Sequence, residues 1–167
     1  KQDFAIYTDP GLNSFSTVGT AASISGLFTL GNKLYVVADE NLYSVDASGG
    51  ETFLGIILGT KSVLFTRNNK TTLQVVIVAE ANVYYLEGVT LAQVTDSDLP
   101  SGVHSATFMD GYVIYGVANG RFFLSGANEA STIDALDFAT ADGSPDQGVL
   151  VKVFGRELWY FGTEIEV

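Results

Sequence analysis

The stretch LFTLGNKLYVVADENLYSVD, from Leu27 to Asp46, holds three short apolar runs separated by two turn-like pairs. Similar phrases return as LFTRNNKTTLQVVIVAEANVYYLE at 64–87 and ATFMDGYVIYGVANGRFFLSG at 106–126. The runs are rich in Val, Ile, Tyr and Phe, which favour β-strands. The Gly-Asn, Asp-Gly and Asn-Gly pairs between them are typical of hairpin turns. The chain therefore repeats one antiparallel hairpin unit.

A fourth apolar segment completes each of the first three units, at 51–58, 90–96 and 135–139. Each unit, including a fourth near the end of the chain, begins with a phenylalanine before a turn: Phe28, Phe65, Phe108 and Phe154. Four antiparallel strands repeated at about 40 residues are typical of a β-propeller blade. One blade cannot bury both faces alone, so stacked neighbours must cover them. Such stacking explains the near-continuous apolar run LQVVIV, which lacks strict alternation.

We therefore expect an all-β fold, a partial β-propeller of about three and a half four-stranded antiparallel blades in one domain over residues 1–167. The blades are expected at about 24–58, 62–96, 103–139 and 149–167. An incomplete set of blades does not close a ring, so we expect a fragment of a larger closed propeller. An open or stacked antiparallel sandwich is the alternative fold. Within the third unit, 128–138 is the one stretch that could hold a helical turn.

Composition limits the classes of function. The formal net charge is −11, with 8 Lys and Arg against 19 Asp and Glu, which argues against direct binding of nucleic acid. The charge indicates either simple solubility or an acidic surface for a basic partner. The absence of cysteine excludes disulfides and thiolate metal sites. We expect no membrane span and no signal peptide, because no apolar run approaches about 18 residues and the chain opens KQDFAIYTDPG.

An ordered set of turns and strands resembles a known family. PGL at 10–12 leads into the first hairpin, and VTDSDLPSGVHSATFMDGYVIY at 94–115 spans the second blade junction. The next blade junction is spanned by STIDALDFATADGSPD at 131–146 and RELWYFGT at 156–163. Together, from Pro10 to Thr163, they resemble the N-terminal part of the packaged-DNA-stabilising proteins of short-tailed phages. These proteins are also called tail accessory or head-completion proteins.

The resemblance implies structural work in a virion. Family members are longer, propeller-like proteins, several copies of which form a ring beneath the portal. The ring plugs the channel after DNA packaging. The implied partners are portal or adaptor proteins and the tail needle and tailspikes. The implied location is the tail or neck of a particle assembled in the cytoplasm of a host bacterium.

The search for catalytic residues gives only weak candidates. The single histidine, His104, follows a Pro-Ser-Gly turn and is better explained as a turn or interface residue. Asp134, Asp137, Asp142 and Asp146 lie in a segment that reads as a loop, without the ligand spacing of a calcium loop. No phosphate-binding glycine motif is present. We therefore expect no enzyme activity, cofactor or metal. A carbohydrate-binding or carbohydrate-acting propeller, or a generic protein-binding propeller, is the alternative.

We expect recognition to lie in the blade-connecting loops 96–104 and 128–147, because loops on a rigid scaffold often carry binding residues. The candidate interface residues are Asp96, Asp98, Pro100, His104, Asp134, Asp137, Asp142 and Asp146. Trp159, with Tyr160 and Phe161, could stack against a sugar, but their strand-like context favours a place in the blade core.

Overall fold

The structure is a computed structural model that describes residues 11, 14–20, 23–59, 62–141 and 147–163. All regular elements within these ranges are β-strands. No helix in the described part of the chain is long and apolar enough to cross a membrane.

Three four-stranded antiparallel sheets and one two-stranded sheet follow one another along the chain. The first sheet contains β1 (Ile24–Leu30), β2 (Lys33–Ala38), β3 (Asn41–Val45) and β4 (Glu51–Ile56). The second contains β5 (Val63–Arg67), β6 (Gln74–Ala79), β7 (Asn82–Glu87) and β8 (Thr90–Gln93). The third contains β9 (Val103–Met109), β10 (Tyr112–Val117), β11 (Arg121–Gly126) and β12 (Glu129–Thr140). The terminal sheet contains β13 (Gly148–Phe154) and β14 (Glu157–Gly162).

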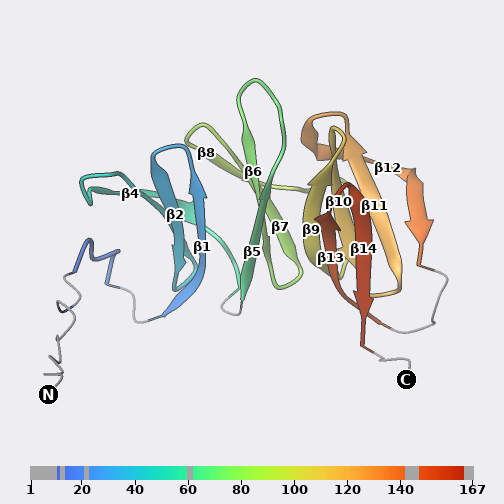
Figure 1. The fold of residues 1–167 in the computed structure, drawn as a ribbon, viewed down its shortest axis with the longest axis horizontal. Coiled ribbons are helices and arrows are strands. Elements are labelled where there is room, and N and C mark those ends of the chain that lie inside the picture. Colours follow the sequence, from blue (N-terminus) through green and yellow to red (C-terminus); the bar gives the residue numbers. More distant parts are fainter. Residues whose placement is uncertain (1–10, 12–13, 21–22, 60–61, 142–146, 164–167) are drawn as a thin grey trace, which may run out of the picture.

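The sheets are arranged as the blades of an incomplete propeller (Figure 1). Within each four-stranded sheet the strands lie in sequence order. The first strand of each sheet contacts the first strand of the next, so that β1, β5, β9 and β13 form one inner row. The four described sheets do not close a ring. The prediction of a partial β-propeller is therefore confirmed, and the sandwich alternative is wrong.

Two-residue turns join several of the hairpins. The predicted Asp-Gly turn joins β9 to β10, with φ angles of 48° at Asp110 and 97° at Gly111. Positive φ at both central residues matches the right-handed twist of the flanking strands. Asp39 and Glu40 adopt the same left-handed region between β2 and β3, with φ of 44° and 64°. Local turn chemistry thus fixes the register of these pairs.

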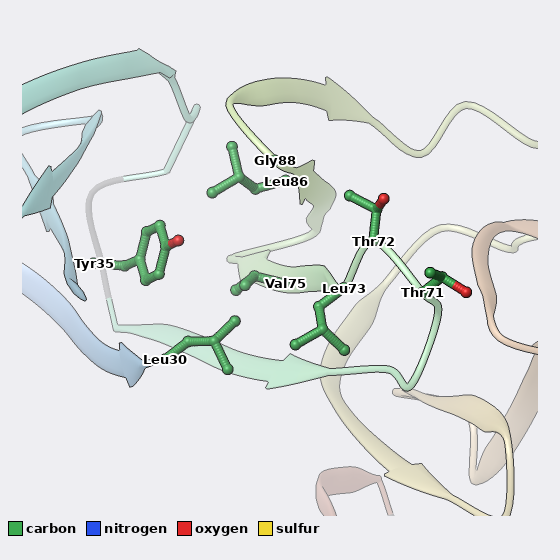
Figure 2. Close-up of a pocket in the computed structure, with 8 residues that line it drawn as sticks. All are labelled: Leu30, Tyr35, Thr71, Thr72, Leu73, Val75, Leu86 and Gly88. Carbon is green, nitrogen blue, oxygen red and sulfur yellow. The ribbon is translucent and has the colours of Figure 1, made fainter. Parts of the chain in front are cut away.

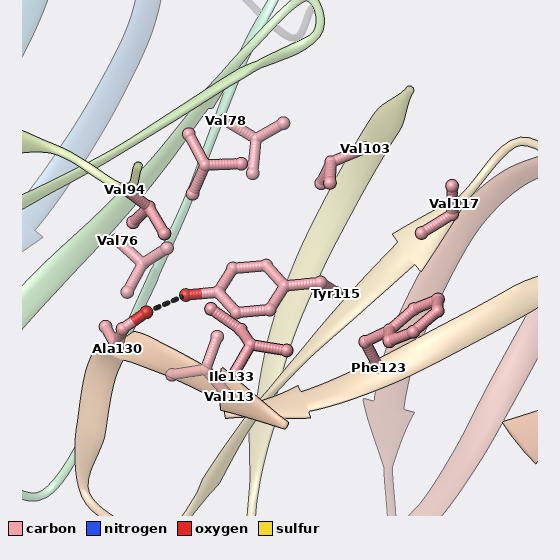
Figure 3. Close-up of a cluster of buried hydrophobic side chains, with 11 residues drawn as sticks. Val76, Val78, Val94, Val103, Val113, Tyr115, Val117, Phe123, Ala130 and Ile133 are labelled. Atoms are coloured by element: carbon pink, nitrogen blue, oxygen red, sulfur yellow. Dashed lines mark hydrogen bonds between the residues drawn. The ribbon is translucent and has the colours of Figure 1, made fainter. Parts of the chain in front are cut away.

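Two apolar clusters fill the spaces between the sheets. Between the first and second sheets lie Tyr35, Val37, Ile77 and their neighbours. Between the second and third lies a cluster that includes Tyr115, which is fully buried (Figure 3). Every residue of β6 is buried, because sheets cover it on both faces. This explains the continuous apolar run in its sequence.

Two sequence interpretations are wrong. Residues 129–140 form the long strand β12 in place of the expected loop and helical turn, and this strand includes the segment 135–139 that was expected as a fourth strand. β12 pairs with β11 through an irregular register, in which Ser125 faces Ile133 and Phe123 faces Phe138. The extra residues of β12 bulge outward and are exposed, which is why their polar composition read as a loop. Trp159 and Phe161 are also about half exposed, so they are not core residues of the described structure, whereas Tyr160 is half-buried and packs against His104.

Candidate functional site

Asp96, one of the predicted interface residues, holds two elements together. One carboxylate oxygen accepts a hydrogen bond from the backbone N–H of Asp98 at 2.9 Å. The other accepts one from the N–H of Ile133 on β12 at 3.1 Å. These backbone bonds lower the pKa of Asp96. Asp98 is exposed and Pro100 half-buried, so the segment before β9 offers Asp98 to solvent while Asp96 anchors it.

His104 lies on β9, as expected, and faces the terminal sheet. Its Nδ1 is 2.8 Å from the Ser105 hydroxyl, and its ring meets the Tyr160 ring edge-on at 6.2 Å. Burial lowers its pKa. Its Nε2 is buried without a hydrogen bond of good geometry, although nearby backbone groups of Val117 and Val149 oppose the effect of burial on the pKa. The structure therefore places His104 in a contact between two sheets of the same chain.

Asp134 and Asp137 lie exposed on the bulge of β12. The Asp134 carboxylate accepts a hydrogen bond from the N–H of Leu136 at 2.9 Å, which closes a local turn. Asp142 and Asp146 lie outside the described residues. In the described ranges, no three His, Asp or Glu side chains are placed to hold a metal ion.

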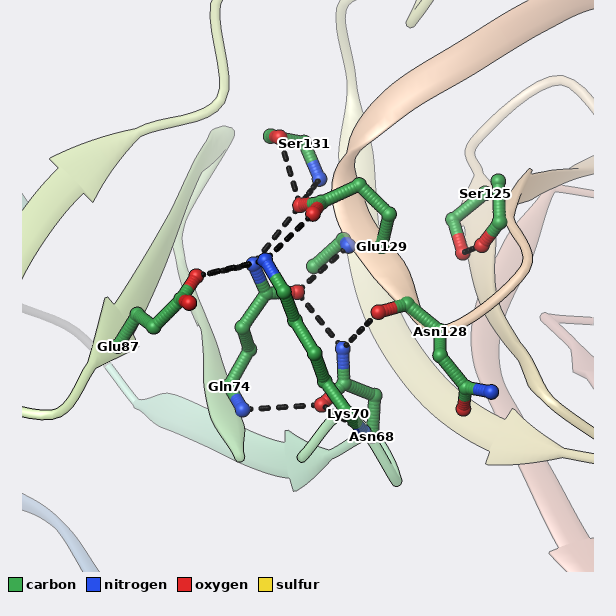
Figure 4. Close-up of polar contacts among 10 residues, drawn as sticks. Asn68, Lys70, Gln74, Glu87, Ser125, Asn128, Glu129 and Ser131 are labelled. Carbon is green, nitrogen blue, oxygen red and sulfur yellow. Dashed lines mark hydrogen bonds and ion pairs between the residues drawn. The ribbon is translucent and has the colours of Figure 1, made fainter. Parts of the chain in front are cut away.

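Sequence reasoning missed a polar network between the second and third sheets (Figure 4). The Lys70 ammonium lies 2.9 Å from the Glu87 carboxylate and 2.7 Å from that of Glu129. The side-chain N–H groups of Gln74 donate to the same two carboxylates, each at 2.8 Å. One cation and one amide therefore connect β7 of the second sheet to β12 of the third.

The Gln74 side chain is fully buried and also fixes the loop that precedes it. Its carbonyl oxygen accepts hydrogen bonds from Asn68 Nδ2 at 2.7 Å and from the N–H of Ala130 at 2.8 Å. Asn68 Nδ2 also donates to the carbonyl of Asn128 at 3.0 Å. Loop 68–73 is thus attached to the third sheet as well as to its own. The sequence feature that could have indicated this network is a glutamine at the start of the apolar run of β6.

The network shifts the acidity of its members. Burial alone would raise the pKa of Glu129, but hydrogen bonds from Lys70, Gln74 and Ser131 outweigh it and lower that pKa from 4.5 to about 2. Hydrogen bonds to Glu129 and Glu87 raise the pKa of Lys70. The network is therefore fully charged near neutral pH.

Stability is expected to fall as the pH drops through the acid range. A carboxylate whose folded pKa lies below its unfolded value stabilises the fold above the unfolded value. For Glu129 that contribution is complete above pH 4.5 and is lost as the pH falls towards about 2. In Glu129→Gln, the melting temperature should depend less steeply on pH across this window, as thermal unfolding followed by circular dichroism would measure.

Asp110→Asn is the matched control for this prediction. Asp110 pairs with Arg156 at 3.4 Å, and both side chains are largely exposed. Exposed ion pairs contribute little to stability. An acid dependence that is the same in Glu129→Gln and in the wild type would contradict the role assigned to the network.

A cavity of about 300 Å³ lies between the first and second sheets, beside loop 68–73 (Figure 2). Four of its eight lining residues are leucine or valine, and three others carry a hydroxyl group, so the wall is about equally apolar and polar. The lining residues are Leu30, Tyr35, Thr71, Thr72, Leu73, Val75, Leu86 and Gly88.

The Tyr35 hydroxyl points into this cavity (Figure 2). The residue is only 8% exposed, and burial raises its pKa. In the described part of the chain, its hydroxyl has no hydrogen-bond partner. Because the hydroxyl faces the cavity, it can donate a hydrogen bond to an acceptor that enters, while the leucine and valine side chains beside it can contact an apolar group.

Comparison with known proteins identifies the family. The family model described as bacteriophage P22 Gp10, β-propeller, matches residues 4–167. The chain belongs to this family. It is therefore a member of the phage proteins that stabilise packaged DNA, as the resemblance implied. Among curated proteins, none is similar enough in sequence to count as a relative of this chain.

Solved structures are similar in fold. The computationally designed Ika4 protein matches with a TM-score of 0.58 and 17% identity over 90% of this chain and 99% of its own. BamB from Moraxella catarrhalis matches with a TM-score of 0.62 and 17% identity, over 81% of this chain and 40% of its own. YCF48 bound to a D1 peptide matches with a TM-score of 0.62 and 14% identity, over 86% of this chain and 48% of its own. The chain thus spans less than half of the last two proteins, and the likeness concerns the fold alone.

Proposed function

We propose that this chain forms part of a non-enzymatic structural protein of the phage virion that helps to close the portal channel and joins the portal to the tail. The family match over residues 4–167 carries this proposal. The interlocked sheets support it, because a scaffold that bears force in a particle must be rigid.

The proposed partners are portal or adaptor proteins, the tail needle and tailspikes, and further copies of the chain arranged in a ring. Ring symmetry would multiply modest contacts into a firm closure. We propose that residues 1–167 act as a single propeller-like domain. The protein would be assembled in the host cytoplasm and end in the neck or tail of the particle.

The net charge of −11 supports a passive role towards DNA. An acidic wall repels phosphate groups, so it would keep packaged DNA from adhering to the plug. Contact with basic surfaces of partner proteins would be favoured by the same charge.

A phage that encodes this sequence allows a direct test. Particles assembled without the protein should package DNA and then lose it, so nuclease-resistant DNA per particle should fall. Supplying the wild-type protein should restore it. Mass spectrometry of purified wild-type particles should find peptides of this chain. Their absence from well-covered particles would overturn the virion role, and normal DNA retention without the protein would overturn the role in closure.

A further inference from the structure

The bulge of β12 exposes one leucine between two aspartates. Leu136 is 83% exposed, more than any other large apolar side chain among the described residues. The hydrogen bond from its N–H to the Asp134 carboxylate fixes the turn around it. Asp134 and Asp137 flank it and are exposed. Covering this exposed leucine with a partner would remove apolar surface from water and so favour association.

The cavity between the first two sheets has the complementary chemistry. Lys33 lies on the same face of β2 as Tyr35 and Val37, because strand side chains alternate, and that face is packed against the second sheet. By the same alternation, Arg67 shares a face of β5 with Val63 and Phe65, which is packed against the first sheet. Both cations are therefore directed to the gap that contains the cavity.

Register places the two cations at the rim of the cavity. Lys33 pairs with Leu30 and Arg67 pairs with Val75, and both partners line the cavity. Both cations are exposed, and neither forms an ion pair with a carboxylate of the described residues. Only eight Lys and Arg occur in the whole chain, and two of them lie beside this cavity, although neither lines it.

We propose that the Asp134–Asp137 bulge of one copy docks into this cavity of a second copy. Leu136 would fill the aliphatic part, and the Tyr35 hydroxyl would donate to a backbone carbonyl of the bulge. Asp134 and Asp137 would face Lys33 and Arg67. The inference rests on the proposed self-association in a ring and names its contact. Two different surfaces meet, so the contact is head-to-tail and can build a ring.

Sedimentation velocity of the full chain tests the proposal. The wild type should associate as its concentration rises to about 500 µM, more strongly at low salt. Leu136→Ser should weaken the association by about tenfold or more, and so should the double variant Lys33→Glu, Arg67→Glu. A chain that stays monomeric throughout would overturn the proposal.

Mixing the two variants separates this contact from any other. A Leu136→Ser copy keeps an intact cavity, and a Lys33→Glu, Arg67→Glu copy keeps an intact bulge. Each alone should be monomeric, while the mixture should form one-to-one pairs. Ile56→Ser, which changes an aliphatic side chain of β4 that is 60% exposed, should associate as the wild type does. Failure of the mixture to pair would overturn the proposal.

The outcome is independent of the particle experiments. All substituted side chains are exposed, so the variants should fold, and unchanged melting curves would confirm it. If the chain does not self-associate as described but is still found in particles, only this inference is rejected. Retention of the contact with the protein absent from particles would reject only the proposed function.

Discussion

Replacing Tyr115 by alanine is expected to lower the free energy of unfolding by about 4 kcal/mol. The ring is fully buried between the second and third sheets, among valines from both (Figure 3). Its hydroxyl donates to the carbonyl of Ala130 at 2.7 Å, which ties β10 to the start of β12. Alanine would leave a cavity and an unpaired carbonyl in the same place. Urea unfolding followed by circular dichroism, with linear extrapolation, would measure the loss.

Two conservative variants separate the ring from the hydroxyl. Tyr115→Phe keeps the ring and loses the hydrogen bond, so about 1 kcal/mol should be lost. Tyr112→Phe changes an exposed tyrosine of the same strand and should stay within about 0.5 kcal/mol of the wild type. If Tyr115→Ala lowers the free energy of unfolding no more than Tyr115→Phe does, packing between the second and third sheets contributes little to stability. The stacked-sheet account of stability would then be wrong.

The hairpins were predictable because their signals are local. Turn pairs such as Asp110–Gly111 and the β-branched runs beside them specify a strand, a turn and a strand within a few residues. Residues 135–139 were expected as a fourth strand, but the full length of β12 was missed, because its strand character comes from pairing with β11 and most of its side chains face solvent. An exposed outer strand with a bulge has the composition of a loop, and no local rule distinguishes the two.

The candidate sites were less predictable because they join distant segments. NNKTTL at 68–73 reads as a turn, and nothing near Glu129 indicates a partner in that turn. The cavity exists only because the first two sheets stand side by side. Asp134 and Asp137 were chosen from sequence as candidate interface residues, and the structure adds Leu136 between them, which composition alone does not single out.

Replacing Gln74 by alanine is expected to cost about 3 kcal/mol of stability. Four hydrogen bonds meet at its side-chain amide, and the residue is fully buried. Alanine leaves the N–H of Ala130 without its acceptor and leaves Asn68 with one partner fewer. Two carboxylates lose a shared donor at the same time. Equilibrium unfolding in urea would give the change in free energy.

Gln74→Leu tests whether hydrogen bonds or volume cause the loss. Leucine nearly fills the space of glutamine but forms no hydrogen bonds, so it should cost nearly as much as alanine. Gln93→Ala, at an exposed position of β8, should change stability by less than about 0.5 kcal/mol. Full stability in Gln74→Leu would show that the amide only fills space. If the amide does fix loop 68–73, both Gln74 variants should also weaken self-association, because that loop carries Thr71 and Thr72 at the cavity.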